Sequence, residues 1–461
     1  MRSRIFALLC ASTLGITTLL LAGCPATGDD VRPPRTGLVF PSGLAVSADE
    51  SVLFVANANS ELRFDSGSVL AIDLQAIDDA IADWLDSGRM TVPDGCIRDA
   101  LVPTLLQCDE SLAIDPSGGV RIGNFASEIG VQQVGPDHMR VVVAVRGDPS
   151  VTWIDYRTTG ASAGQLKCAG SDDFPLCDRD NRLISLRNDP DLLSLIGEPF
   201  GVHVGTSDGN DYALVTHLSL ANVTLVNLPR DNGAEEAGAP VLVDSLPGLF
   251  NGDPTTGVRS AVGVASRPSA TGHALFYVTS RSEERVQILS VERTDRGPIL
   301  LPVQSFLLNG VSPSDDSRGI TFNDDGSRAY IVNRSPAVLH VIDTSDGPDG
   351  FPRNQPVGFA ELCRDASNVA ATRIPGRGER VYAACFPGGQ VWTFDPEAGG
   401  DPIAITDVGR GPHAVALARG RNRLYVANVL EDTLAVIDLT PGAATENRMV
   451  MRLGVPRQVE D

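Results

Sequence analysis

Seven arginine and histidine side chains stand at the ends of short apolar segments spread along the chain. They are Arg146, His217, Arg259, Arg281, Arg318, Arg334 and His413. Arginine and protonated histidine donate charge-assisted hydrogen bonds to carboxylates and phosphates. We therefore predict a binding site for an anionic or polar ligand where the fold gathers these residues. The alternative is a structural role for single members, such as an ion pair between Arg318 and a neighbouring aspartate.

Other chemistry is poorly represented in the sequence. The six histidines show neither HxH nor HExxH spacing, so we expect no metal site of that kind. Residues 376–378 are rich in glycine but are typical of a hairpin turn rather than a phosphate loop. Residues 178–181 resemble part of a calcium loop but lack the glycine and distal glutamate of an EF-hand. We expect no cofactor, and no catalytic residue is identified.

The N-terminal segment has the features of a bacterial export signal. An arginine-containing start precedes an apolar run over residues 5–21, which is too short, with these flanks, to span a membrane. The Leu-Ala-Gly-Cys sequence at residues 21–24 resembles a bacterial lipobox, which implies cleavage before Cys24 and a diacylglycerol on its sulfur. We predict a signal peptide over residues 1–23 and a tether over residues 24–37. The alternative is an ordinary secretory signal with a chance cysteine.

This signal predicts a lipid-anchored protein of the cell envelope, on the periplasmic or cell-surface side. The membrane is then one partner, through the N-terminal lipid. The formal net charge is −21, which disfavours nucleic acid as a partner.

Six cysteines remain after Cys10, which leaves with the signal, and the lipidated Cys24. They fall into close pairs, namely Cys96 and Cys108, Cys168 and Cys177, and Cys363 and Cys385. An even number of cysteines in an exported chain predicts disulfides. Six cysteines allow 15 pairings, and we predict the three local ones.

The rest of the chain repeats one unit seven times. The unit is an apolar strand, a polar turn, a second strand, a short loop and a third strand that often ends in aspartate. In the last copy the second strand is residues 424–428 and the third is residues 434–438. An outer fourth strand follows, as at residues 402–409. Mostly small residues open the first strand, namely Gly43, Gly130, Gly201, Ala261, Gly319, Asn368 and Ala414.

Each unit has apolar residues on both faces of its sheet. A single meander cannot bury both faces, so the units must stack on one another. We predict an all-β fold, a seven-bladed β-propeller of four-stranded antiparallel blades over residues 38–456. Two insertions, residues 75–127 and 157–198, follow the first and second blades. The first begins with a helical pattern that places Ile77, Ile81 and Trp84 on one face.

The repeats resemble the YVTN-type β-propeller family, which includes lactonase-like proteins. The resemblance is carried by residues 412–415, 424–428 and 436–438, and by residues 41–44 with 54–57. It covers residues 38–456 and implies a propeller more than any one activity. Long loops between repeats are where propellers commonly carry function.

Strand alternation predicts two faces. The loops from fourth to first strand and from second to third strand share one face, which would carry the seven arginines and histidines. We expect a binding or interaction module for an envelope protein, a glycan or a small anionic ligand. The alternative is a lactonase-like hydrolase with its site in the central funnel. Three or more buried acidic, asparagine or histidine side chains within metal-binding distance in that funnel would favour it.

Overall fold

The computed structural model describes residues 31–160, 163–170, 172–184, 193–231, 237–252, 257–269, 272–308 and 315–457. The predicted signal peptide, Cys24 and the first part of the predicted tether lie outside these ranges. Over the ranges described, no helix is both long enough and apolar enough to cross a bilayer.

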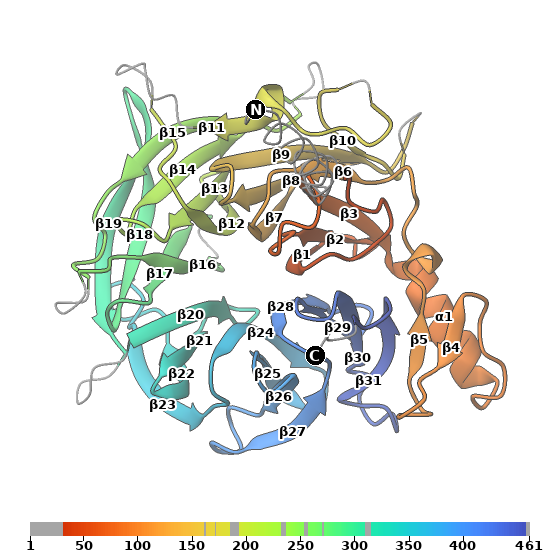
Figure 1. Cartoon of the computed structure of the whole chain (residues 1–461). Coiled ribbons are helices and arrows are strands. Elements are labelled where there is room, and N and C mark those ends of the chain that lie inside the picture. The colour runs from red at the N-terminus through yellow and green to blue at the C-terminus, as the bar shows by residue number, and fades with distance from the viewer. Residues whose placement is uncertain are drawn as a thin grey trace, which may run out of the picture.

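Seven antiparallel sheets surround a central axis, as Figure 1 shows. Each sheet is one blade, and its strands a to d follow in chain order from the axis outward. Strand a of every blade contacts strand a of the next, and β28 (Pro412–Ala418) of blade 7 contacts β1 (Pro41–Val46) of blade 1. The predicted seven-bladed β-propeller is confirmed.

The blades share one strand order. The remaining inner strands a are β7 (Ala126–Gly135), β12 (Pro199–Ser207), β16 (Ala261–Arg267), β20 (Asp315–Phe322) and β24 (Ala366–Ile374). Strands b are β2 (Val52–Asn57), β8 (His138–Val145), β13 (Asn210–His217), β17 (Leu275–Ser280), β21 (Arg328–Ser335), β25 (Gly378–Cys385) and β29 (Arg423–Asn428). Strands c are β3 (Gly67–Asp73), β9 (Ser150–Arg157), β14 (Val223–Leu228), β18 (Arg285–Thr294), β22 (Ala337–Asp343), β26 (Gln390–Phe394) and β30 (Thr433–Asp438). Strands d of blades 3 to 7 are β15 (Val241–Leu246), β19 (Gly297–Leu307), β23 (Gln355–Glu361), β27 (Pro402–Asp407) and β31 (Arg448–Leu453).

The hydrophobic core lies between neighbouring blades, because both faces of each sheet are apolar. Between blades 6 and 7, for example, Tyr382 and Val391 pack against Leu424 and Val426. Tyrosines occupy the same place on strand b of blades 4 to 7 and are fully buried; they are Tyr277, Tyr330, Tyr382 and Tyr425. No blade could bury these side chains alone, which is why the repeats must close into a ring.

Every inner strand carries a register shift near its start. At equivalent places beside these shifts stand the residues that we call the axis ring, namely Gly43, Glu128, Gly201, Gly263, Gly319, Asn368 and Ala414. In blades 2 and 4 this differs from the sequence-based alignment, which placed Gly130 and Ala261 here. A strict two-residue alternation does not count the extra residue that a bulge inserts.

Close contact between inner strands explains the glycines of the axis ring. A Cβ atom on Gly263 would lie 2.0 Å from the carbonyl oxygen of Arg318 in the next blade. A Cβ atom on Gly201 would lie 2.3 Å from the carbonyl oxygen of Val262. Only glycine permits the backbones to approach this closely.

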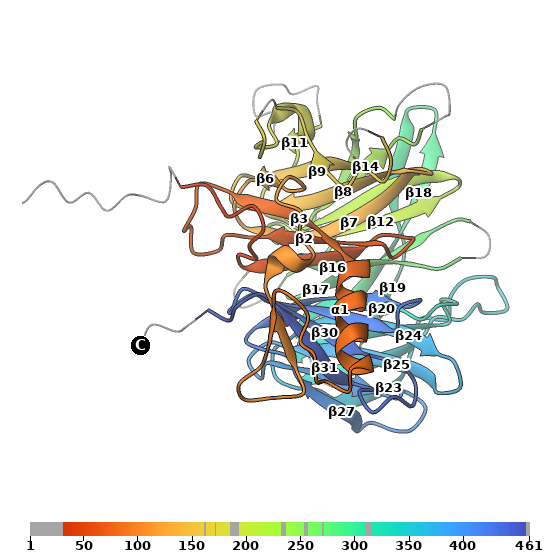
Figure 2. The same ribbon diagram turned by 90° about the vertical axis from the view of Figure 1, so that its right-hand side faces the viewer.

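The first predicted insertion closes the ring from outside, as Figure 2 shows. Helix α1 (Leu74–Asp86) buries Ile77, Ile81 and Trp84 in a core that blades 1 and 7 share. The last part of the insertion forms β6 (Val120–Ile122), which pairs with β3 and is strand d of blade 1.

A hairpin within this insertion reaches the outer edge of blade 7. Its strands are β4 (Cys96–Arg98) and β5 (Leu106–Cys108), and β5 pairs in parallel with β31. Asp99, in the loop between β4 and β5, forms a 2.7 Å ion pair with Arg452 of β31. We call β4 and β5 the clasp, because they join the first and last blades.

The second insertion supplies the outer edge of blade 2. Strands β10 (Leu166–Lys167) and β11 (Arg182–Ile184) both pair with β9, so the outer strand of this blade is split. The three predicted disulfides are confirmed, joining Cys96 to Cys108, Cys168 to Cys177 and Cys363 to Cys385.

The first and last described residues lie on one face of the ring (Figure 2). Val31 accepts a hydrogen bond from the backbone of Asp65, in the b–c loop of blade 1. Arg457 donates a backbone hydrogen bond to Glu431, in the b–c loop of blade 7. This face carries the b–c and d–a loops, and we call it the mouth face.

Candidate functional site

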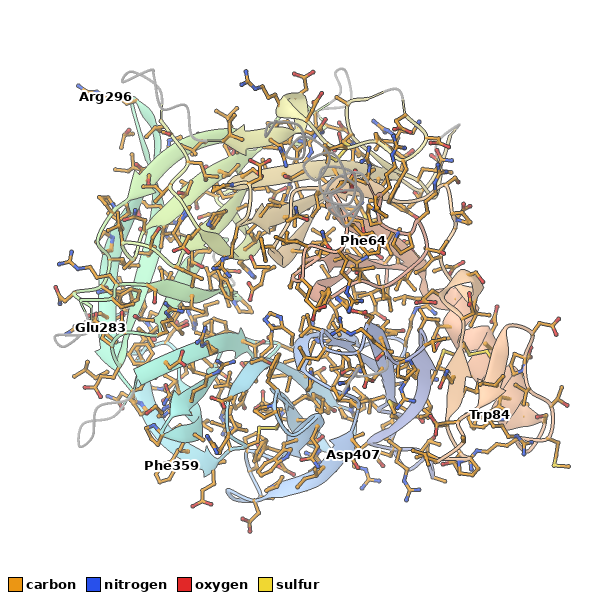
Figure 3. The ribbon with its side chains drawn as sticks, in the orientation of Figure 1. Phe64, Trp84, Glu283, Arg296, Phe359 and Asp407 are labelled. Atoms are coloured by element: carbon orange, nitrogen blue, oxygen red, sulfur yellow. A yellow bond between two sulfur atoms is a disulfide. The ribbon has the colours of Figure 1, made fainter. Side chains whose placement is uncertain are left out.

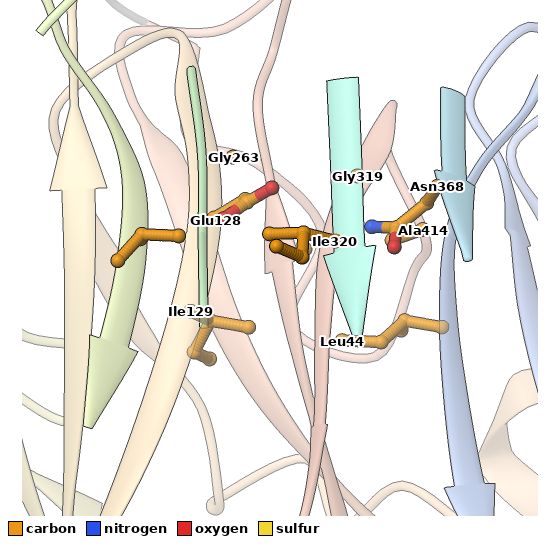
Figure 4. A pocket seen from close by; sticks show the side chains of 10 residues that line it. Leu44, Glu128, Ile129, Gly263, Gly319, Ile320, Asn368 and Ala414 are labelled. Atoms are coloured by element: carbon orange, nitrogen blue, oxygen red, sulfur yellow. The ribbon is translucent and has the colours of Figure 1, made fainter. Parts of the chain in front are cut away.

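A cavity of about 110 Å³ lies on the central axis, between the inner strands of six blades (Figure 4). It is lined by Gly43, Leu44, Glu128, Ile129, Gly263, Val264, Gly319, Ile320, Asn368 and Ala414. Among these ten lining residues only Glu128 and Asn368 have polar side chains. The cavity is large enough for several water molecules or a small head group.

Glu128 is the acidic group of this cavity. Its Oε2 accepts a hydrogen bond of 3.2 Å from the backbone N–H of Val202 in blade 3. No cationic side chain in the described part of the chain pairs with it. Burial raises the pKa of Glu128 to about 7, and the hydrogen bond from Val202 offsets only part of that effect. The carboxyl group is therefore poised to exchange a proton near neutral pH.

Asn368 lies across the cavity from Glu128, on β24 of blade 6. Its Oδ1 accepts a hydrogen bond of 2.7 Å from the backbone N–H of Val369. Figure 4 shows its carboxamide nitrogen and the Glu128 carboxyl group both directed toward the axis. The cavity therefore offers a donor on one wall and an acceptor on the other.

The next layer away from the mouth face is apolar. Each inner strand contributes the residue that follows the axis ring, namely Leu44, Ile129, Val202, Val264, Ile320, Val369 and Val415. Figure 4 shows Leu44 and Ile129 below Glu128 and Asn368. A ligand that enters from the mouth face would therefore meet an apolar floor.

Three of the predicted site residues lie toward the mouth-face ends of strands in blades 5 and 7, although none of them lines the cavity itself. Arg318 precedes the axis ring on β20, His413 precedes it on β28, and Arg334 lies near the end of β21. Burial lowers the pKa of Arg334, and the nearby positive charge of Arg318 lowers it further. The pKa of His413 is lowered by burial and also by both arginines. These mutual effects place the three side chains in one electrostatic neighbourhood.

The same three side chains also have partners within the fold. The Arg318 guanidinium binds Asp316 through two contacts, of 2.5 and 3.1 Å. Arg334 Nε donates to the carbonyl oxygen of Ala366 at 2.9 Å, and His413 Nδ1 lies 2.9 Å from that of Ser42. The structural alternative weighed from the sequence is thus correct for the Arg318 pair, although one guanidinium can serve both roles because it has five donors.

Two of these contacts belong to a ring of hydrogen bonds that joins every pair of neighbouring blades. In each, a side chain binds a backbone carbonyl at the start of the next inner strand. The pairs are Ser42 with Ala126 (2.8 Å), Ser127 with Phe200 (2.6 Å), Thr216 with Val262 (2.6 Å), Thr279 with Arg318 (3.0 Å), Arg334 with Ala366 (2.9 Å), Ser367 with Pro412 (2.8 Å) and His413 with Ser42 (2.9 Å). This ring fixes the shape of the opening.

The other four predicted residues are not part of this group. Arg146 is partly exposed and lies 3.5 Å from Glu198 in an ion pair. Arg259 is exposed and Arg281 is half-buried, both at the ends of blade 4 strands.

His217 is fully buried, unlike a residue that faces a ligand. Its ring nitrogens bind the carbonyl oxygen of Gly197 and the hydroxyl of Thr224, at 3.1 and 2.9 Å. Burial lowers the pKa of His217 to about 4, so it is neutral at physiological pH. An apolar strand pattern does not show whether its last residue turns inward or outward, and here it turns inward.

Sequence reasoning missed Glu128. A signal was present, because Ser127-Glu128-Ile129 matches Ser-Gly-Leu at residues 42–44 and Ser-Asn-Val at residues 367–369. Alignment on the serine rather than on the glycine would have placed a carboxyl group in the axis ring.

Residues 160–164 read Gly-Ala-Ser-Ala-Gly and match G-x-S-x-G, but the nucleophile elbow requires a strand-to-helix turn. Residues 161 and 162 lie outside the described ranges, and the segment stands between β9 and β10 rather than before a helix. Within the described ranges no three histidine, cysteine, aspartate or glutamate side chains are grouped as metal ligands would be.

Larger cavities open on the face opposite the mouth. One of about 390 Å³ lies between blades 5 and 6, and one of about 300 Å³ between blades 4 and 5. Their charged groups pair with one another, as Arg328 does with Glu379 and Arg267 with Asp346. They are therefore weaker candidates for an anion than the axial cavity.

No family model matches the sequence, and no curated protein matches it either. Solved structures do share the fold. A periplasmic gluconolactonase from Pseudomonas aeruginosa aligns with a TM-score of 0.52 and 16% identity, over 75% of this chain and 90% of its own. A Bacteroides fragilis protein named as a 6-phosphogluconolactonase aligns with a TM-score of 0.54 and 13% identity, over 88% and 99%. Hydrazine synthase from Kuenenia stuttgartiensis aligns with a TM-score of 0.50 and 12% identity, over 90% and 98%. At these identities the likeness extends to the fold, a β-propeller shared by proteins of different activities.

Proposed function

We propose that this protein is an extracytoplasmic, lipid-anchored propeller that binds a small anionic or polar ligand at the mouth of its axial cavity. The observation that carries the proposal is that Arg318, Arg334 and His413 stand on the mouth-face side of the axis ring and influence one another electrostatically. Guanidinium groups that are partly removed from water bind carboxylates more strongly than exposed ones do. An envelope protein or glycan that presents such a group could be the physiological source.

The mouth is tested by replacing its three cationic or polar side chains together. Binding of butyrate and of inorganic phosphate is measured by calorimetry with the wild type and with Arg318→Gln/Arg334→Gln/His413→Gln. We expect one of these anions to bind the wild type at least tenfold more tightly, since a lost charge-assisted hydrogen bond is worth about 1.4 kcal/mol or more. Equal affinity in both proteins would end the proposal.

Arg296→Gln is the matched control for the mouth. Arg296 is exposed at the tip of the β18–β19 hairpin, far from the axis in Figure 3. Removal of one arginine charge at this distant place should leave the affinity for both anions unaltered. Thermal unfolding of the triple variant checks that the ring of inter-blade hydrogen bonds survives.

The extracytoplasmic location is supported by the three disulfides, which persist in oxidising compartments. The fold is also that of a gluconolactonase named as periplasmic. The lipid anchor is tested by Cys24→Ser, which should abolish labelling with an alkyne fatty acid and release the protein from the membrane fraction. Cys10→Ser is the control and should leave both properties intact.

A second candidate function is hydrolysis of a lactone, favoured by Glu128. A carboxyl group with a pKa of about 7 is suited to accept a proton from water at neutral pH. The fold neighbours named as lactonases supply the substrate class. Hydrolysis of glucono-δ-lactone above the spontaneous rate by the wild type, but not by Glu128→Gln, would support this function over binding alone.

A further inference from the structure

Glu128 lines the axial cavity, and two arginines stand toward the mouth face on another side of the ring. Glu128 belongs to blade 2, whereas Arg318 and Arg334 belong to blade 5 and Asn368 to blade 6. Blades 2 and 5 are three places apart in a ring of seven, which is as far apart as two blades can be. Glu128 and the two arginines therefore lie on opposite sides of the axis. We call the side of Glu128 the acidic wall and the side of Arg318 and Arg334 the cationic wall.

The acidic wall lacks a counter-ion. One carboxylate oxygen of Glu128 is held by the Val202 N–H, and the described residues supply no ion pair to the group. A charged carboxylate with one hydrogen bond in such a site is costly, and a bound cation offsets that cost. An ammonium group suits this place, because it donates hydrogen bonds in several directions and the cavity is small.

The cationic wall has spare donors. Arg318 uses Nε and one terminal nitrogen on Asp316, and Arg334 uses Nε on Ala366. The carboxamide nitrogen of Asn368 points toward the axis one layer deeper (Figure 4). These groups together suit one carboxylate.

We propose that the ligand of the axial cavity is a small amino acid, with its ammonium group on Glu128 and its carboxylate on Arg318, Arg334 and Asn368. This inference rests on the proposed function, because it identifies the ligand class of the same opening. A simple anion would satisfy only the cationic wall and leave Glu128 unpaired. A zwitterion satisfies both walls and adds no net charge to the cavity.

The test compares ligands that differ only in one charged group. Affinities of glycine, β-alanine and 4-aminobutyrate are measured by calorimetry at pH 8, beside those of acetate, propionate and butyrate and of the alkylammonium ions of equal length. We expect one amino acid to bind at least tenfold more tightly than both its matched acid and its matched amine. If no amino acid exceeds its matched acid, the proposal is overturned.

Two variants assign the charges to the walls. Glu128→Gln should abolish the higher affinity for the amino acid than for its matched acid, without lowering the affinity for that acid. Arg318→Gln should abolish the higher affinity for the amino acid than for its matched amine. Glu397→Gln, which alters a carboxylate on the opposite face, is the control and should change neither ratio. A preference that persists in Glu128→Gln would contradict the assignment.

The outcomes also separate this inference from the proposed function. If butyrate or phosphate binds and the arginine variants weaken that binding, but an ammonium group adds no affinity, the proposed anion site is supported and the proposed amino-acid site is refuted. If no acid, amine or amino acid binds, both proposals are refuted.

Discussion

Glu128 occupies a position where five of the seven blades have glycine or alanine, namely Gly43, Gly201, Gly263, Gly319 and Ala414. In those blades the backbones of neighbouring strands approach closely, and the side chain is absent or minimal. A carboxyl group at the same level must project into the axial cavity. Its position is therefore a consequence of the repeat, and its charge is what distinguishes this cavity from an apolar one.

Glu128 should make stability depend on pH. Its pKa rises from 4.5 in the unfolded chain to about 7 in the folded protein, so the folded state holds the proton more tightly. This contribution is fully present below pH 4.5 and is lost as the pH rises through 7. Glu128→Gln lacks it, so the variant should match the wild type at pH 4 and exceed it at pH 8 by up to about 3 kcal/mol. Urea unfolding at pH 4, 6 and 8 measures the difference, and an offset that is the same at all three pH values would refute this account.

His340 should act in the opposite direction. It is buried, its Nε2 has no hydrogen-bond partner, and burial lowers the pKa of its ring to about 4. The folded state therefore favours the neutral ring, and stability is lost as the pH falls from 6.5 through 4. His340→Phe cannot titrate and should lose less stability on acidification, by up to about 3 kcal/mol at pH 4. Thermal unfolding of both proteins at pH 7 and pH 4 tests this, with equal acid sensitivity as the contrary result.

At the scale of single residues, sequence reasoning singled out the arginines and the histidine of the proposed site and missed Glu128. Arg318, Arg334 and His413 stand at the ends of strands, where face assignment follows from alternation alone. Glu128 lies beside a β-bulge, and a bulge changes which residue faces the axis by an amount that the apolar pattern does not record. His217 ends a strand too, but whether its side chain points into the core or toward a ligand depends on packing against the neighbouring loop.

Among the elements, the inner strands are the least tolerant of change. Gly263→Ala would place a Cβ atom 2.0 Å from the Arg318 carbonyl oxygen and 2.8 Å from Thr279 Oγ1. The strands of blades 4 and 5 would have to separate, at an expected cost of about 1–3 kcal/mol. The shift would also move Arg318 at the mouth, so both stability and anion affinity should fall.

Gly43→Ala is the matched comparison for Gly263→Ala. Its Cβ atom would meet Ile129 Cγ2 at 3.1 Å and the Ser127 carbonyl oxygen at 3.2 Å, which calls for movements of only tenths of an ångström. Denaturant unfolding should therefore show a smaller loss than for Gly263→Ala. An equal or greater loss would mean that strand separation is not the limiting factor.

The repeat predicted the elements of the blades well, because each blade shows its strands in local patterns of apolar residues and turns. It did not predict the clasp. Strand β5 pairs with β31, more than 300 residues later in the chain, and parallel pairing of short strands has no local signature. Similarly, β10 and β11 complete blade 2 from within an apparent insertion, because two short segments share one edge.

For the whole molecule, closure of the ring depends on the clasp and on α1. Strands a to d of blade 7 all come from the C-terminal part of the chain, and the N-terminal part joins this sheet only through β5 and β4 of the clasp. Cys96→Ser/Cys108→Ser should lower stability by about 3 kcal/mol, as expected for a disulfide that closes a short loop. Hydrogen exchange should then increase first in β31 and α1, which border this seam.

Cys363→Ser/Cys385→Ser is the control for the clasp. That disulfide holds the loop before β24 to the end of β25, inside blade 6 and away from the seam. Its loss should lower stability too, but should leave exchange in β31 and α1 unchanged relative to the rest of the ring. The same exchange pattern in both variants would argue against a weak point between blades 1 and 7.

The placement of Val31 and Arg457 on the mouth face limits how the protein can be oriented at a membrane. Only six residues lie between Cys24 and Val31, and the seven Cα-to-Cα steps that join them span at most about 25 Å. If Cys24 carries the proposed lipid, the opening of the cavity therefore faces the membrane surface, at a distance of a few nanometres. Small solutes could diffuse into this gap from the side, whereas a glycan or an envelope protein would reach the opening only by a narrow, extended end that carries the anionic group.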